Sequence, residues 1–115
     1  MKTKSAKAKG RRLQDWVKET LIRHLNLNAE DVRTAVMGER GVDVSLVPSV
    51  RSQFPYNVEC KNVERLNIWK AWEQASRDER GSLKAILVIS KNRHTPLVVC
   101  DAEHFISIHK KENRS

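Results

Sequence analysis

Three charged residues in the middle of the chain have the types and spacing needed for chemistry on a phosphate ester. Asp43 stands between two valines, and Glu59 and Lys61 flank Cys60. Side chains along a strand leave alternate faces, so Glu59 and Lys61 share one face of a sheet while Cys60 points to the other. If the strands that carry them are neighbours, the two carboxylates and the ammonium meet at one edge of the sheet.

Two carboxylates form an oxygen-rich site suited to Mg²⁺, which keeps several waters and needs only one or two protein carboxylates. We expect Asp43 and Glu59 to hold Mg²⁺, the backbone carbonyl of Cys60 to add a ligand, and Mn²⁺ to substitute. Lys61 could orient the attacking water and neutralise a pentavalent phosphate. The alternative is a surface ion pair, which stabilises little. Glu64, after the strand, is expected to be solvated.

The elements that must position these residues follow from hydrophobic periodicity. Strands are predicted over 42–46, 56–62, 83–90 and 96–101, with a short extended piece at 34–37 and loops at 38–41 and 48–55. Helices are predicted from residue 11, over 68–77 and after Asp101, with a single turn capped by Asn28. Gly81 closes the 68–77 region. This order indicates an α/β fold, a small mixed sheet flanked by helices.

The tryptophans fall at helical spacing on these predicted helices. Trp16 follows Leu13 by three residues, and Trp69 and Trp72 lie on the helix after the Lys61 strand. We expect them to pack in the core, although Trp69 and Trp72 could instead wedge against distorted DNA.

Positive charge is concentrated at the two ends of the chain. The net charge is +8, and residues 1–12 hold six Lys and Arg and no acid. We expect a flexible basic tail over 1–10, one domain over 11–109 and a second basic tail over 110–115. Such tails favour a polyanionic partner, and the alternative is that they only keep the chain in solution.

Other classes of protein are disfavoured by the composition. The length of 115 residues suits one domain. No apolar run approaches the ~20 residues that cross a bilayer, and no apolar segment follows the basic start as in a secretory signal. We therefore expect no membrane partner and a cytoplasmic location, in the host if the chain is phage-encoded. Cys60 and Cys100 are expected to be buried reduced thiols, and the four histidines lack ligand spacing.

The pattern Gly-Val-Asp-Val, fourteen residues, then Glu-Cys-Lys resembles the core signature of the PD-(D/E)XK nuclease superfamily. With Lys-Gly-Arg-Arg-Leu opening a helix at residue 9, the chain looks like the small archaeal-type Holliday junction resolvases and their phage relatives. The resemblance implies a restriction-endonuclease-like core, with Asp43 and Glu59 as metal ligands and Lys61 as the catalytic lysine.

Two further residues enter only through this resemblance. Gln14 stands where those resolvases carry a glutamate, so it would complete the catalytic set as a neutral member that holds a water or a phosphate. Residues 67–74 resemble the helix that follows the core in phage members, which makes Gln74 a candidate helper at the site.

The expected partner is DNA, and in particular a four-way junction. Arg11 and Arg12 are predicted at a helix start, where backbone amides favour phosphate, and with Lys7, Lys9 and Arg40 they are expected to grip the backbone. Because a junction presents two symmetry-related cuts, a homodimer is expected. The alternatives are a nuclease for other DNA structures, a catalytically weakened DNA-binding module, and an RNA-binding protein that uses only its tails.

Overall fold

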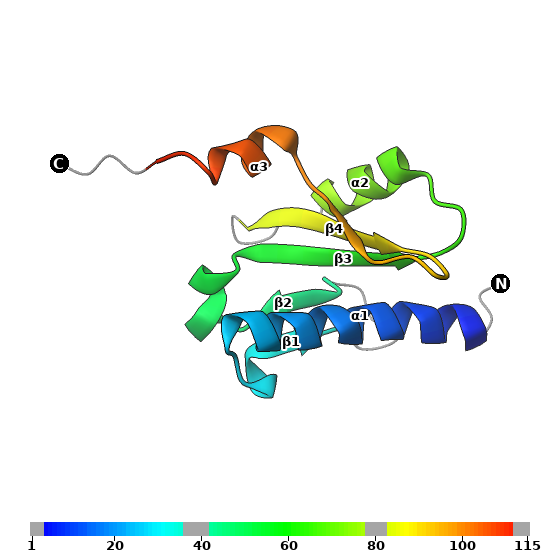
Figure 1. The fold of residues 1–115 in the computed structure, drawn as a ribbon, viewed down its shortest axis with the longest axis horizontal. Coiled ribbons are helices and arrows are strands. Elements are labelled where there is room, and N and C mark those ends of the chain that lie inside the picture. Colours follow the sequence, from blue (N-terminus) through cyan, green and yellow to red (C-terminus); the bar gives the residue numbers. More distant parts are fainter. Residues whose placement is uncertain (1–3, 36–41, 78–82, 112–115) are drawn as a thin grey trace.

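A computed structural model describes residues 4–35, 42–77 and 83–111 (Figure 1). Within these ranges the order is one helix, three strands, a second helix, two strands and a third helix, with 3-10 turns at Ala29–Asp31 and Pro48–Gln53. The elements are α1 (Lys4–Leu25), β1 (Val32–Thr34), β2 (Val44–Leu46), β3 (Tyr56–Asn62), α2 (Ile68–Arg77), β4 (Lys84–Ser90), β5 (Leu97–Val99) and α3 (Ala102–Ser107).

The five strands form one mixed sheet in the order β1-β2-β3-β4-β5. The pair β3 and β4 is parallel, and every other neighbouring pair is antiparallel. A parallel pair needs a crossover connection, which the segment containing α2 supplies between the end of β3 and the start of β4. The expected α/β class is thereby confirmed.

Helix α1 covers one face of the sheet. Its residues Leu13, Val17 and Leu21 recur every fourth position, form one stripe and are buried. They pack against Val58 and other inward residues of the sheet in one apolar cluster. The opposite face is covered over β4 by α2, which buries Ala71 and Ala75.

The first helix begins seven residues earlier than Arg11, so the prediction of an unstructured tail is wrong from Lys4 to Gly10. Two physical reasons account for the longer helix. Alanine and lysine, which dominate this stretch, are strong helix formers. In addition, the Asn62 side-chain amide donates to the Lys9 carbonyl at 2.8 Å, which attaches these turns to the end of β3.

The predicted burial of the tryptophans is wrong for Trp69, which is 79% exposed, and for Trp16, which is 42% exposed. In α2 the sheet-facing positions belong to Ala71 and Ala75, and Trp69 lies about 200° around the helix from Ala71. Trp72 is half-buried.

The predicted caps are confirmed. Asn28 is the N-cap of the 3-10 turn Ala29–Asp31, and its backbone N–H donates to Asp31 Oδ2 at 2.8 Å. Asp101 Oδ1 accepts from the His104 N–H at 3.0 Å at the start of α3.

Other boundaries differ slightly from the predictions. The short extended piece is β1 at Val32–Thr34, and the connection after β2 holds the 3-10 turn Pro48–Gln53. The predicted loop 38–41 and the helix-closing Gly81 lie outside the described residues. Within the described ranges, none of the helices combines the length and the apolar character that crossing a membrane requires.

Candidate active site

Asp43 comes directly before β2 and lies against β3. The strands β2 and β3 pair antiparallel, with Val44 opposite Val58. Asp43 Oδ2 accepts a hydrogen bond of 2.8 Å from the backbone N–H of Cys60. The carboxylate therefore contacts the residue between Glu59 and Lys61, as expected if the two strands are neighbours.

Helix α1 adds a third element to this point. Gln14 Nε2 donates to Asp43 Oδ1 at 3.1 Å, and this contact is partly buried. A carboxylate only accepts hydrogen bonds when ionised, so the amide nitrogen of Gln14 must face it and the amide oxygen stays available. Each Asp43 oxygen also keeps a second lone-pair direction for another ligand.

Glu59 and Lys61 lie on β3 on either side of this contact. Both side chains are half-buried, whereas Val58 and Cys60 are buried in the cluster under α1. Alternation along the strand therefore places Glu59 and Lys61 on the other face. Asp43 and Gln14 therefore meet at the backbone N–H of Cys60, while Glu59 and Lys61 extend from the neighbouring positions of β3 toward the face opposite α1.

The thiol of Cys60 is held in its protonated form by this environment. Burial raises the pKa of Cys60 most, and the charges of Asp43 and Glu59 raise it further. The thiol is free and buried, as predicted, and packs in the core. Cys100 is free and only half-buried.

The donors at this point suit a hard cation. Carboxylates on Asp43 and Glu59, the carbonyl of Cys60 and the amide oxygen of Gln14 are all oxygen ligands of the kind that Mg²⁺ takes. Across residues 4–35, 42–77 and 83–111, no cluster of three or more His, Cys, Asp or Glu could hold a metal ion. Two carboxylates with neutral oxygens fit Mg²⁺, which needs no larger acidic cluster.

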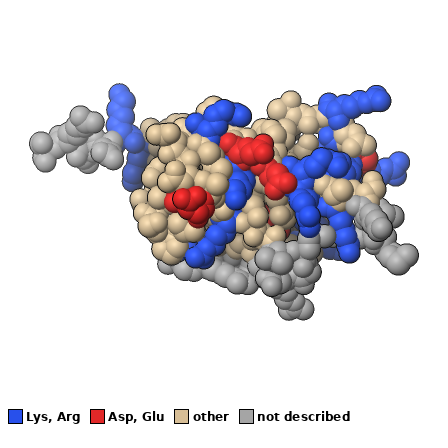
Figure 2. Space-filling view, turned by 90° about the horizontal axis from the view of Figure 1, so that it is seen from below, with Lys and Arg blue, Asp and Glu red and all other residues tan. Residues whose placement is uncertain are grey.

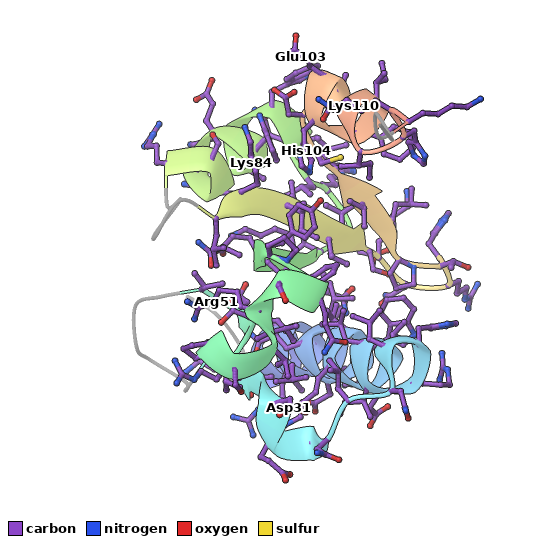
Figure 3. All side chains as sticks on the ribbon, turned by 90° about the vertical axis from the view of Figure 1, so that its left-hand side faces the viewer. Asp31, Arg51, Lys84, Glu103, His104 and Lys110 are labelled. Carbon is purple, nitrogen blue, oxygen red and sulfur yellow. The ribbon has the colours of Figure 1, made fainter. Side chains whose placement is uncertain are left out.

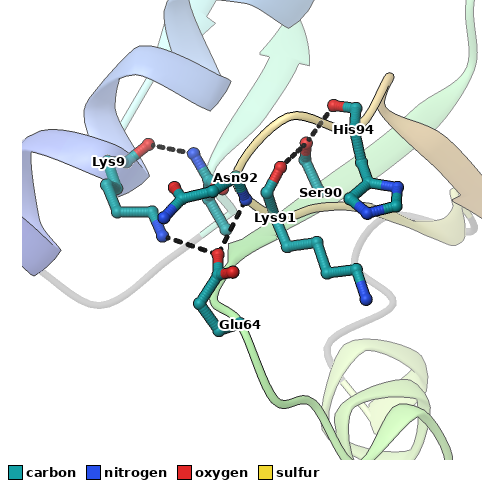
Figure 4. Close-up of polar contacts among 7 residues, drawn as sticks. Lys9, Glu64, Ser90, Lys91, Asn92 and His94 are labelled. Carbon is teal, nitrogen blue, oxygen red and sulfur yellow. Dashed lines mark hydrogen bonds and ion pairs between the residues drawn. The ribbon is translucent and has the colours of Figure 1, made fainter.

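A second polar network fixes the start of α1 beside the ends of β3 and β4 (Figure 4). Lys9 Nζ pairs with Glu64 Oε2 at 3.2 Å, and the backbone N–H of Asn92 donates to the same oxygen at 2.7 Å. The hydrogen bond from Asn92, and then the charge and hydrogen bond of Lys9, hold the pKa of Glu64 below its usual value against partial desolvation. Glu64 is exposed, as predicted, but it is tied down rather than free.

Sequence reasoning missed Asn62 and Asn92 in this network. Their partners lie 53 and 28 residues away, and a single asparagine at a strand end or in a turn carries no pattern that would reveal such a contact.

The predicted DNA-binding residues are placed differently from one another. Lys7, Arg11 and Arg12 are exposed on α1. Because α1 begins at Lys4, Arg11 and Arg12 lie two turns inside the helix, so the argument from a helix N-terminus does not apply to them. The Lys9 side chain is only 17% exposed and is paired with Glu64. Arg40 lies outside the described residues.

Seen from the side on which α1 lies, the molecule has an uneven distribution of charge. Figure 2 shows Lys and Arg gathered most densely toward its right-hand side, where α1 begins in Figure 1. Acidic side chains interrupt the basic ones toward the middle of this face.

Gln74 is not brought to the site. It is exposed on α2, which packs on β4. Among the described residues no hydrogen bond joins it to Asp43 or Gln14.

No family model matches the chain, and no significant match was found to a curated protein or to a solved structure.

Proposed function

We propose that the protein is a Mg²⁺-dependent DNA endonuclease that hydrolyses phosphodiester bonds, with a Holliday junction as its preferred substrate. The observation that carries the proposal is the pair of hydrogen bonds on Asp43, from Gln14 Nε2 at 3.1 Å and from the Cys60 N–H at 2.8 Å. They join three elements at the segment that bears Glu59 and Lys61. A surface ion pair would not need a glutamine from a separate helix.

Each residue has a defined part in this proposal. Asp43, Glu59 and the Cys60 carbonyl would hold the divalent cation, which when bound lowers the pKa of water and neutralises charge on the phosphate. Lys61, two residues from Glu59 on the same face of β3, would orient the nucleophile and balance negative charge at the phosphorus. Gln14 would hold Asp43 in position through its N–H and accept from a water through its oxygen.

Exposed basic side chains on α1 would supply the affinity for DNA. Contacts from Lys7, Arg11 and Arg12 to phosphates would carry no sequence information, so binding would follow backbone shape and fall steeply with salt. Gln74 is left without a proposed role, because it is exposed on α2.

A second candidate function is a DNA-binding module whose cleavage is weakened. The neutral Gln14 at a position that contacts Asp43 favours it, since two acids bind a cation less tightly than three. Nucleases for other branched or broken DNA share the proposed chemistry and differ only in substrate. An RNA-binding protein that uses only its tails would leave the Asp43 contacts without a function.

The test compares a labelled four-way junction, a linear duplex and a single strand, each with Mg²⁺, Mn²⁺ or EDTA. We expect paired, symmetric nicks in the junction alone, with either metal and not with EDTA. Equal cutting of all three DNAs would keep the chemistry and replace the substrate. Tight binding of the junction without cleavage under any condition would leave the DNA-binding module.

A variant pair separates this activity from a contaminating nuclease. Lys61→Met should lower the cleavage rate by about 100-fold or more, the range seen when one charge-stabilising group is removed. Lys70→Met removes an exposed lysine from α2 and should leave the rate unchanged. Equal rates for the two variants would contradict the role of Lys61.

A further inference from the structure

A cavity of about 470 Å³ opens where the parallel strands β3 and β4 end. It lies between the segment that leads from β3 into α2 and the turn that joins β4 to β5. Its floor is apolar and is formed by Val63, Leu66, Ile68, Ile89 and Leu97. Pockets that bury small ligands measure about 300–1,000 Å³, and the carboxyl ends of parallel strands are a common place for them.

The cavity begins directly beside Lys61. Ile89 is opposite Lys61 in the register of β3 and β4, and neighbouring strands lie about 4.8 Å apart. Val63 follows Lys61 by two residues, and its backbone N–H continues the ladder by donating to the Ser90 carbonyl at 3.2 Å. Side chains directly opposite each other, or two residues apart, share a face of a sheet. Two of the nearest same-face neighbours of Lys61 therefore line the cavity.

The rim of the cavity is polar, and the turn after β4 holds it in shape. Ser90 Oγ donates to the His94 carbonyl at 3.0 Å (Figure 4), and the His94 N–H donates to the Lys91 carbonyl at 3.1 Å. In Figure 4 the side chains of Lys91 and His94 extend from this turn toward the side on which α2 lies. Together with Thr95, these residues line the cavity and supply hydroxyl, ammonium and imidazole groups beside its apolar floor.

The charges around the cavity nearly cancel. Glu64 and Lys91 are the charged residues of its lining, and Glu64 is also paired with Lys9 at 3.2 Å. An apolar floor with a polar, nearly neutral rim suits a flat neutral ligand that has hydrogen-bonding groups along its edge. A nucleobase has this chemistry, whereas a phosphate does not.

We propose that this cavity receives one unpaired nucleobase of the DNA strand whose phosphate lies at Lys61. The inference rests on the proposed nuclease function and narrows its substrate to DNA in which the nucleotide beside the cut is unpaired or easily unpaired. A base inside a duplex cannot enter between the β3–α2 segment and the β4–β5 turn without leaving its stack. Leaving the stack costs least where the base is mismatched or already unpaired. The cavity would thus favour branched DNA over a perfect duplex.

Helix α3 supplies a control region at the opposite end of β3. Tyr56, the first residue of β3, holds this helix through a contact of 2.6 Å between Tyr56 Oη and His104 Nε2. Figure 3 views the molecule from the end at which β4 begins, at Lys84, and shows His104 beneath α3. The cavity instead lies beyond the last residue of β3. Ile106 on α3 is 69% exposed and is remote from the cavity lining.

The first test uses 2-aminopurine, an adenine analogue whose fluorescence rises when it leaves the base stack. It is placed in turn at each position around the branch point of a four-way junction, and the protein is added to saturation in EDTA. At one position the fluorescence should rise at least about 3-fold on binding. Leu97→Glu places a charge in the apolar floor and should remove this rise. Val98→Glu is the matched control, because Val98 is similarly exposed (58% against 62%) and faces the other side of β5.

The second test fills the cavity. Ile68→Trp should lower the single-turnover rate of junction cleavage in Mg²⁺ by about 10-fold, whereas Ile106→Trp makes the same change on α3 and should leave the rate unchanged. On a junction with an abasic sugar at the responding position, Ile68→Trp and Ile106→Trp should cleave equally, because no base has to enter the cavity. Circular dichroism shows whether each variant is folded.

The outcomes separate this inference from the nuclease proposal. If the wild type nicks the junction but no 2-aminopurine position responds, or if Leu97→Glu and Val98→Glu respond alike, the cavity does not receive a base and the nuclease proposal stands. A response that depends on Leu97 without cleavage in Mg²⁺ would support the cavity and contradict the nuclease proposal. A wild-type protein that does not bind the junction would overturn both.

Discussion

Apolar side chains of the same types are buried in one region of the molecule and exposed in another. At β2 and β3, Val44 and Val58 are fully buried beneath α1, whereas at β5 and α3 Leu97 is 62% and Ile106 69% exposed. Where α1 covers the strands, the inward positions form the core, and the positions between them are left to carry Asp43, Glu59 and Lys61 in fixed places. At β5, the apolar side chains stay exposed. The covered part of the sheet thus carries the candidate site, and the β5 edge carries exposed apolar side chains.

The largest difference in stability is expected when leucine is replaced by alanine in each of the two regions. Leu46 is 1% exposed and Leu97 is 62% exposed. Leu46→Ala should lower the free energy of unfolding by about 2–4 kcal/mol through lost burial and a residual cavity. Leu97→Ala should change it by less than about 0.5 kcal/mol in dilute protein.

Urea unfolding in dilute protein checks this pair. If Leu46→Ala and Leu97→Ala lower the free energy of unfolding equally in dilute protein, the proposed difference between the buried and the exposed region is wrong.

A smaller change in stability is expected from a substitution at the contact between α1 and Asp43. Gln14→Glu replaces an amide donor with a second carboxylate beside Asp43, so without metal the two acids repel each other. Mg²⁺ should relieve that repulsion. In EDTA the melting temperature should fall by about 4 °C for each ~1 kcal/mol lost, and Mg²⁺ should restore it.

Two comparisons make the Gln14→Glu result specific. Gln74→Glu changes an exposed glutamine on α2 and should show no response to Mg²⁺. If the wild type cleaves the junction slowly because Gln14 is neutral, Gln14→Glu should also raise the rate of junction cleavage. A melting temperature that is the same in EDTA and Mg²⁺ for Gln14→Glu would argue against a cation beside Asp43.

The smallest change in the free energy of unfolding is expected from a substitution of Glu64, because its contacts are exposed and screened by solvent. Its pKa is lowered in the folded state, so its stabilisation is full above the unfolded pKa of about 4.3 and is lost as pH falls through the folded pKa. Glu64→Gln should therefore be less stable than wild type at pH 7 and equal to it at about pH 2–3.

Urea unfolding across this pH range measures the difference. Glu19→Gln, an exposed acid on α1, is the control and should show no such convergence. A stability difference between wild type and Glu64→Gln that stays constant with pH would mean that the charge of Glu64 contributes nothing.

Local patterns in the sequence predict much of this fold. The limits of β3 and α2 agree with the structure, since period-two and period-3.6 spacing are strong there, and both predicted caps are present. Faces are harder to predict, because Ala71 is too weakly hydrophobic to reveal that it faces the sheet with Ala75, while Trp69 is exposed. The start of α1 was hidden because a lysine-rich stretch can be read as a solvated tail.

The approach of Asp43 to β3 was predictable from the sequence, but its contacts were not, and the predicted helper Gln74 is not brought to this point. Alternation around Cys60 predicts that Glu59 and Lys61 share a face, and the structure agrees. The contacts of Asp43 with Gln14 and with the Cys60 N–H span 29 and 17 residues. They depend on how α1 and β2 pack on β3, which no local pattern determines.

The most direct test of the nuclease proposal is single-turnover cleavage of a four-way junction in Mg²⁺ by wild type, Asp43→Asn and Asp15→Asn. Asp43→Asn removes the charge at the point where α1, β2 and β3 meet, whereas Asp15→Asn removes an exposed acid from the same helix as Gln14. We expect paired nicks from wild type and Asp15→Asn, and a rate at least about 100-fold lower from Asp43→Asn with junction binding retained. Cleavage by Asp43→Asn at the wild-type rate would contradict the proposed site.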